Sequence, residues 1–168
     1  MLQRTVRLVR RYPQHPRERV WRALTDANVL GRWFMPNDFQ PQLHRAFTFR
    51  MKPQRGWDGV TWCEVIELEP PARLAYRYRG QASGEKVMAC AGVRSEKAGQ
   101  AVKGMFAELD TVLRFRLSDE GRGTRLELEH GGFAGWKLVL VSFIMGMGYR
   151  RSVLPRLATE LDRLAAAG

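Results

Sequence analysis

The feature that most constrains the fold of this chain is an alternation of apolar and polar residues that returns in segment after segment. It covers residues 5–10, 47–52, 62–69, 74–79, 113–117 and 125–130. Because successive side chains of a strand point to opposite faces of its sheet, this period of two indicates half-buried β-strands. A single polar face on each strand is typical of an antiparallel sheet that is covered on one side. The sequence therefore predicts such a sheet, and the other segments must supply its cover.

The C-terminal residues are the expected cover. Residues 136–144 are apolar at nearly every position, and after Gly146-Met147-Gly148 the apolar residues recur at helical spacing. Pro155 falls inside this pattern, and because proline has no N–H to donate within a helix it predicts a kink or a new helix start. We expect a long C-terminal helix packed on the sheet, which gives an α+β fold.

Two short helices are expected after the first strand. Pro16 suits the first position of a helix, where its missing N–H is harmless. Asp26 can cap a second helix over residues 27–33, because its carboxylate can accept a free N–H of the first helical turn. The pattern thus predicts two helices joined at a tight corner.

One segment interrupts the pattern of strands. Residues 83–110 separate two strands that a short hairpin could join, and apolar residues recur at helical spacing within it. We interpret it as an insertion that contains a helix over roughly residues 96–109. Long insertions of this kind often act as lids, and a surface excursion without a role is an equal alternative.

Size and composition fit one globular domain over residues 1–168. Apolar residues make up 45% and charged residues 27% of the chain, which excludes extensive disorder. The longest apolar run, residues 138–149, is too short to span a bilayer, and the N-terminal residues lack the apolar core of a signal peptide. Cys63 and Cys90 form no C-x-x-C pair. We therefore expect a soluble cytoplasmic protein with no membrane span and no disulfide framework.

The net charge is +11, which attracts anionic partners through its field alone. The arginines are scattered along the predicted strands and helices, so we interpret them as a solvated exterior and expect no specific nucleic-acid binding. Three scattered histidines and two distant cysteines give no metal-ligand spacing. No glycine-rich phosphate loop precedes a helix in the required context. Neither a metal nor a cofactor is predicted.

Three ordered motifs carry a family resemblance. They are PRERVWRALTDANVLGRWFMP (residues 16–36), CEVIELEPPARLAYRY (residues 63–78) and GRGTRLELEHGGF (residues 121–133). Together they resemble the START-like (SRPBCC) superfamily, and within it the branch of homologues of an activator of the 90-kDa heat-shock chaperone's ATPase, which is grouped with polyketide cyclases and lipid carriers. The resemblance implies a helix-grip fold, a curved antiparallel sheet wrapped around a long C-terminal helix with an apolar cavity between them. It does not fix one activity.

Large apolar side chains on the predicted inward face are the candidate ligand-binding residues. They are Trp33, Phe34, Phe49, Met51, Trp62, Tyr76, Tyr78, Phe115, Phe133 and Met147. Taken singly, most of these residues fit plain core, but as a set they indicate a site, because apolar pockets lined by aromatic rings are the usual sites for small molecules. The hydroxyls of Tyr76 and Tyr78 need hydrogen-bond partners if they are buried.

Two polar residues, Glu64 and His130, fall on the same predicted face. If both point inward they could meet across the cavity, bind a ligand there and act as acid and base. The alternative places Glu64 near the rim beside an arginine and His130 in a hydrogen bond with the backbone. The remaining histidines, His15 and His44, lie in predicted loops and are expected to face solvent.

Three functions follow from these patterns, and binding of a hydrophobic or aromatic small molecule, lipid-like or polyketide-like, is the leading one. The second is a cyclase-like or hydrolase-like enzyme that uses Glu64 and His130. The third is a chaperone-regulator module that presents its basic face to an acidic protein partner. The sequence leaves the ligand and the oligomeric state open.

Overall fold

A computed structural model describes residues 1–52, 60–80 and 109–168, which form a helix-grip α+β fold. The antiparallel sheet has the order β1-β6-β5-β4-β3-β2. Its strands are β1 (Gln3–Tyr12), β2 (Ala46–Arg50), β3 (Val60–Glu69), β4 (Arg73–Gly80), β5 (Leu109–Glu120) and β6 (Gly123–Ala134). The predicted fold class is confirmed.

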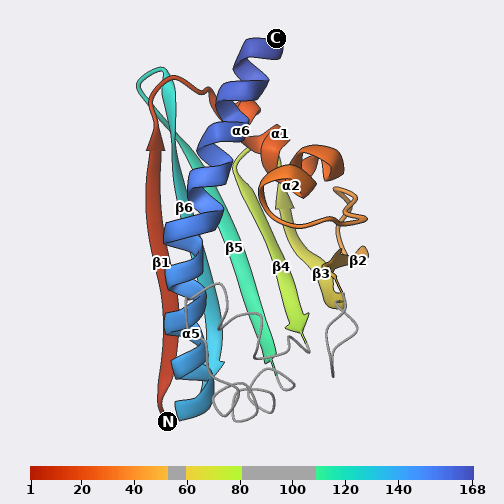
Figure 1. Ribbon diagram of the computed structural model, residues 1–168, viewed down its shortest axis with the longest axis vertical. Helices are drawn as coiled ribbons and strands as arrows, with labels where there is room; N and C mark the ends of the chain where they lie inside the picture. Colours follow the sequence, from red (N-terminus) through yellow and green to blue (C-terminus); the bar gives the residue numbers. More distant parts are fainter. Residues whose placement is uncertain (53–59, 81–108) are drawn as a thin grey trace.

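Helical segments cover one face of this sheet (Figure 1). They are α1 (Arg17–Thr25), α2 (Ala27–Trp33), α5 (Trp136–Gly148), the π-helical turn η1 (Tyr149–Val153) and α6 (Leu154–Ala167). The last three run on as one long C-terminal helix, whose α5 part packs on β1 and β6 and whose α6 part contacts α1 and α2. Arg32 of α2 donates to the buried carboxylate of Glu160 in α6 at 2.6 Å, which fixes the helical corner against this long helix.

Local signals placed the helix ends. The Asp26 carboxylate accepts the N–H groups of Asn28 and Val29 at 3.0 and 3.2 Å, so the predicted cap is confirmed. The new helix start predicted at Pro155 is also confirmed, because α6 begins at Leu154. At this start the N–H of Leu154 donates to the carbonyl of Tyr149, five residues back. This wider turn lets the helical path continue up to Pro155, which has no N–H.

The predicted inward face is confirmed on four strands. Buried side chains include Val6 and Leu8 of β1, Leu74, Tyr76 and Tyr78 of β4, Leu113, Phe115 and Leu117 of β5, and Leu126, Leu128 and His130 of β6. On these strands the alternate positions are mostly charged, so the hydrophobic pattern admits a single choice of face.

The prediction for β3 is wrong. Trp62, Glu64 and Ile66 point to the outer face, where 61% of Trp62 is exposed, while the intervening residues Cys63 and Val65 are buried. Both sets of alternate positions in this strand contain apolar residues. Either Cys63 and Val65 or the Trp62 ring could therefore face the helices, and in the structure Cys63 and Val65 do. A shift in the pairing register between Val65 and Glu67 marks a bulge, after which Leu68 packs against the core.

Ion pairs cover the outer face of the sheet. Arg114 donates to Glu67 at 3.2 Å and to Glu129 at 3.1 Å, and Glu129 also accepts from Arg7 at 3.1 Å. The arginines of these strands thus form the solvated exterior that their scatter predicts, and carboxylates largely neutralise them.

The predicted insertion falls almost entirely outside the described residues. Of the helix expected over residues 96–109, only Leu109 is described, and it begins strand β5. Single-domain organisation over residues 1–168 therefore stays a proposal. Among the described helices, none has the length and apolar character needed to cross a bilayer.

Candidate functional site

Aromatic rings line the inner face of the sheet, the face that the helices cover. Phe47 lies 5.3 Å from Phe49 and 5.2 Å from Tyr76, measured between ring centroids, and Tyr76 lies 6.1 Å from Phe115. These rings come from β2, β4 and β5 and are almost wholly buried. The alternation on each strand brings them together, since every second side chain points toward the helices.

Polar side chains interrupt this apolar interior at one place, which we call the interior polar cluster. It consists of Tyr76, Tyr78, Thr111, His130 and Tyr149. The imidazole of His130 has no exposed surface; its Nε2 lies 2.7 Å from Thr111 Oγ1 and its Nδ1 lies 2.7 Å from Tyr149 Oη. The cluster thus ties β6 to β5 on one side and to the C-terminal helix on the other.

The hydrogen bonds of the cluster fix its protons. The Thr111 hydroxyl donates to the carbonyl of Tyr78 at 3.2 Å, so Thr111 Oγ1 must accept from His130 Nε2–H. His130 Nδ1 then accepts the hydroxyl proton of Tyr149. The neutral tautomer of His130 with its proton on Nε2 thus satisfies both of its hydrogen bonds, to Thr111 and to Tyr149.

Burial keeps the cluster uncharged. Loss of hydration lowers the pKa of His130 to about 3 and raises the pKa of Tyr149 and of Tyr76 well above the ordinary tyrosine value. Burial also raises the pKa of the nearby Cys63 thiol. At neutral pH these residues therefore offer neutral hydrogen-bonding groups, and the geometry gives no charged acid–base pair.

The hydroxyl of Tyr76 differs from its neighbours. Thr61 hydrogen-bonds the Tyr78 phenol, whereas Tyr76 Oη is buried and has no hydrogen-bond partner among the described residues. An unsatisfied buried hydroxyl costs about 1–3 kcal/mol. Burial raises the pKa of Tyr76, and Cys63, Tyr149 and Tyr78 raise it further, while the Tyr76 ring packs against Phe47 and Phe115. A polar atom of a bound molecule could satisfy this hydroxyl.

The structure separates the two residues predicted to act as acid and base. Glu64 is on the outer face, where 45% of its side chain is exposed, with His44 Nδ1 at 3.8 Å and Arg77 opposite it on β4. His130 is on the inner face. The predicted inward orientation of Glu64 is therefore wrong, and so is the alternative bond from His130 to backbone, because its partners are Thr111 and Tyr149.

The other predicted residues are distributed over several environments. Phe49, Phe115 and Phe133 are core, and Trp33 is core as well, since its Nε1–H donates to the carbonyl of Ala23 at 2.8 Å. Phe34 and Met51 are half-buried, and Met147 lines a hollow between β1 and α5.

Not every histidine expected in solvent lies there. His44 is exposed, as predicted. His15 is buried, with its Nε2 2.9 Å from Asp162 Oδ1, so that prediction is wrong.

Two members of the cluster were missed in the sequence. Tyr149 lies between Gly146-Met147-Gly148 and the apolar residues that recur at helical spacing from Val153, and it is buried in the π-helical turn. The available signal was a single tyrosine at the end of the apolar run over residues 138–149, directly before Arg150. Thr111 gave none, because a threonine fits either face of a strand.

The part of the chain that the structure describes contains no set of metal ligands. There, no three His, Cys, Asp or Glu side chains lie close enough together to hold a metal ion.

Comparison with solved structures gives the fold relatives. Protein MLL2253 from Mesorhizobium loti is 29% identical, with 95% of this chain and 98% of that chain covered and a TM-score of 0.73. CalU16 from Micromonospora echinospora is 24% identical, with coverages of 98% and 87% and a TM-score of 0.55. DynU16, a protein of the dynemicin biosynthetic locus, is 19% identical, with coverages of 94% and 47% and a TM-score of 0.64. At these identities the last two show the fold alone.

A search of curated proteins found no significant match. The family comparison was decisive, because the family model described as "Activator of Hsp90 ATPase homolog 1-like protein" matches residues 14–154. That range includes the helical corner, all strands from β2 to β6, His130 and Tyr149. With most of its length matched, the chain belongs to the family of Activator of Hsp90 ATPase homolog 1-like proteins.

Proposed function

We propose that this protein binds a hydrophobic or aromatic small molecule between the sheet and the C-terminal helix, with the Tyr76 hydroxyl bonded to a polar atom of the ligand. The observation that carries the proposal is this buried hydroxyl, which lacks a partner among the described residues. It lies where aromatic rings meet neutral polar groups. An apolar site with a few fixed polar groups is the usual chemistry of small-molecule recognition.

The charge state of the interior supports an uncharged ligand. His130, Tyr76 and Tyr149 are neutral at physiological pH because burial disfavours their charged forms. A charged ligand group would need a counter-charge there, since an unpaired buried charge is costly. A polycyclic or lipid-like molecule with a carbonyl or hydroxyl group fits these conditions.

The comparisons support the same class of function. The family and its structural neighbours fit a ligand-binding fold, and one neighbour comes from a biosynthetic locus for a small molecule. The family's description also names activation of a chaperone ATPase, and the basic surface of this chain is compatible with an acidic partner. We rank that function second, because the buried cluster bears on ligand binding and not on docking.

A matched pair of competitors tests the proposal. The neutral probe N-phenyl-1-naphthylamine reports binding by fluorescence, and 2-acetylnaphthalene and 2-ethylnaphthalene compete with it. We expect the ketone to displace the probe about fivefold more effectively than the hydrocarbon of similar shape, because one hydrogen bond contributes about 1 kcal/mol. Substitution Tyr76→Phe should abolish that preference while probe uptake persists.

The control variant is Tyr78→Phe. Its hydroxyl already bonds Thr61, so the preference for the ketone should survive. The proposal is wrong if the probe shows no saturable uptake, and the role of Tyr76 is wrong if Tyr76→Phe keeps the full preference.

A further inference from the structure

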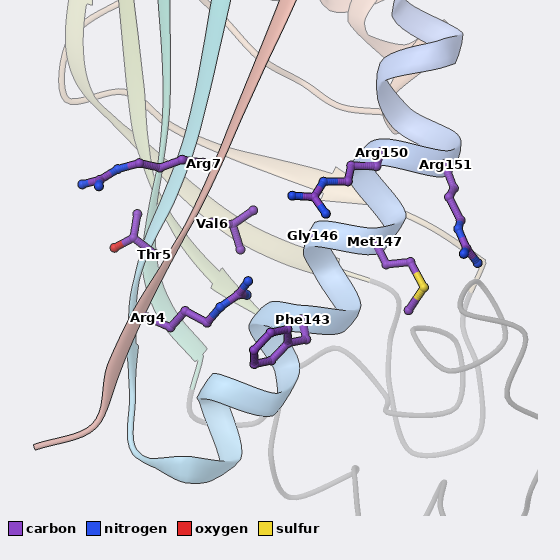
Figure 2. Close-up of a pocket in the computed structure, with 9 residues that line it drawn as sticks. All are labelled: Arg4, Thr5, Val6, Arg7, Phe143, Gly146, Met147, Arg150 and Arg151. Carbon is purple, nitrogen blue, oxygen red and sulfur yellow. The ribbon is translucent and has the colours of Figure 1, made fainter.

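The hollow that Met147 lines lies on the outside of the molecule, between β1 and the C-terminal helix. Its volume is about 530 Å³, and it is formed by residues of β1, α5 and η1 (Figure 2). Four arginines, Arg4, Arg7, Arg150 and Arg151, line it together with Phe143 and Met147, and none of its lining residues is acidic. We call it the β1–α5 pocket.

The arginines of this pocket differ from those on the outer face of the sheet. Arg4 donates to Ser142 Oγ at 2.9 Å and lies 3.7 Å over the ring of Phe143, so neither contact neutralises its charge. No ion pair among the described residues involves Arg150 or Arg151, whereas Arg7 pairs with Glu129 outside the pocket. Arg4 reaches from β1 toward the helix and Arg150 reaches back toward β1 (Figure 2). Positive charge is therefore concentrated here, and none of the described carboxylates pairs with Arg4, Arg150 or Arg151.

An exposed apolar stripe runs along α5 beside the pocket. It consists of Trp136, Leu140 and Phe143, whose exposed fractions are 66%, 46% and 54%. Their spacing of four and three residues places them on one side of the helix, while Val141 and Gly146 pack on the opposite side. Apolar side chains thus occupy both faces of α5, although only one face contacts the sheet.

The start of β1 extends this surface. The N–H of Gly135, just before α5, donates to the carbonyl of Leu2 at 2.8 Å, and 58% of Leu2 is exposed. The N-terminus and the beginning of α5 therefore lie together at one end of the molecule (Figure 1). Leu2 thus adds an exposed apolar side chain beside the start of the stripe, while Arg150 and Arg151 lie further along the same helix, in η1.

We propose that this surface docks the protein on an anionic lipid membrane. Arg4, Arg150 and Arg151 would bind lipid phosphates, and the apolar stripe would enter the boundary between head groups and acyl chains. Exposed tryptophan, phenylalanine and leucine are side chains that enter this boundary, and neighbouring arginines add attraction to anionic lipids. A net charge of +11 also draws the protein toward a negative surface, and it opposes a second copy of this chain as the occupant.

Vesicle co-sedimentation tests the charge requirement. The wild-type protein should bind vesicles of 70% phosphatidylcholine and 30% phosphatidylglycerol and should not bind pure phosphatidylcholine. The double variant Arg150→Gln/Arg151→Gln should bind about 30-fold more weakly, because each arginine near such a surface contributes about 1 kcal/mol. The control Arg45→Gln/Arg122→Gln removes the same charge from exposed sites outside the pocket and should weaken binding less than about threefold.

Insertion of the stripe has its own signal. Phosphatidylcholine with brominated acyl chains, mixed into the anionic vesicles, should quench the tryptophan fluorescence of the wild-type protein. Trp136→Phe should lose most of that quenching, and Leu140→Gln should weaken binding while the fold is retained by circular dichroism. Interior ligand binding would not respond to these changes.

Three results would overturn the proposal. One is equal binding to neutral and anionic vesicles, and another is an equal loss of binding in the control double variant. The third is a dimer in analytical ultracentrifugation that Leu140→Gln dissociates, since that would assign the stripe to a second copy of the chain.

Discussion

Acidification from pH 7 to pH 4 is expected to lower the free energy of unfolding by about 3 kcal/mol through His130 alone. Burial lowers the pKa of His130 to about 3 in the folded protein, while a histidine in the unfolded chain has a pKa of about 6.5. Between these values the unfolded state binds the extra proton and the folded state does not. Stability is therefore fully present above pH 6.5 and falls as the pH falls toward 3.

Urea denaturation at pH 4, 5, 6 and 7 measures this dependence. His130→Gln removes the titrating group, so the decline between pH 6.5 and pH 4 should flatten, while stability at pH 7 should drop because Thr111 or Tyr149 loses a partner. The comparison separates the contribution of His130 from that of carboxylates such as Asp110. Because the pKa of Asp110 is lowered in the folded protein, its protonation in acid also reduces the free energy of unfolding.

The control is His44→Gln, because 72% of the His44 side chain is exposed in the folded protein. It should keep the wild-type slope. An unchanged slope in His130→Gln would contradict the buried, neutral assignment of His130.

Gly123→Ala is expected to destabilise the fold by about 3 kcal/mol. A Cβ at this position would meet the carbonyl oxygen of Tyr12 and would lie 2.5 Å from the Cα of Pro13. Both obstacles are main chain, so the end of β1 would have to move away from β6, and overpacking of this kind is costly. The same movement would shift the corner that leads from β1 into α1.

The matched control is the same chemical change at Gly148. This residue is helical, with φ of −60° and ψ of −43°, and a Cβ there meets nothing within 4 Å. Gly148→Ala should stabilise the protein by about 0.5–1 kcal/mol, because alanine loses less backbone entropy in a helix. Chemical denaturation of both variants measures the pair, and equal effects at the two positions would contradict the close approach of β1 and β6.

The fold was predictable because several local signals agreed. Alternation with charged residues on one face fixed the orientation of β4, β5 and β6, and Asp26 and Pro155 marked helix boundaries that the structure confirms. Each signal acts within a few residues, so sequence alone contains it.

The site was only partly predictable, because its geometry depends on distant segments. Alternation predicted the inward orientation of the aromatic residues of β2, β4 and β5. It gave the wrong orientation for Trp62 and Glu64, because both sets of alternate positions in β3 contain apolar residues. The partners of His130 come from Thr111 and from Tyr149 in the π-helical turn. Hydrogen bonds between elements far apart in the chain leave no periodic trace in the sequence.

Ring-selective NMR with ¹³C-labelled tyrosine and histidine tests the central claim most directly, because it reports whether a guest reaches the interior. N-phenyl-1-naphthylamine would be titrated into the labelled protein, with Tyr76→Phe and His130→Gln to assign the signals. We expect saturation at one probe per protein, with large shifts of the Tyr76 and His130 rings and small shifts at exposed His44. Unchanged Tyr76 and His130 resonances at saturating probe would contradict an interior binding site.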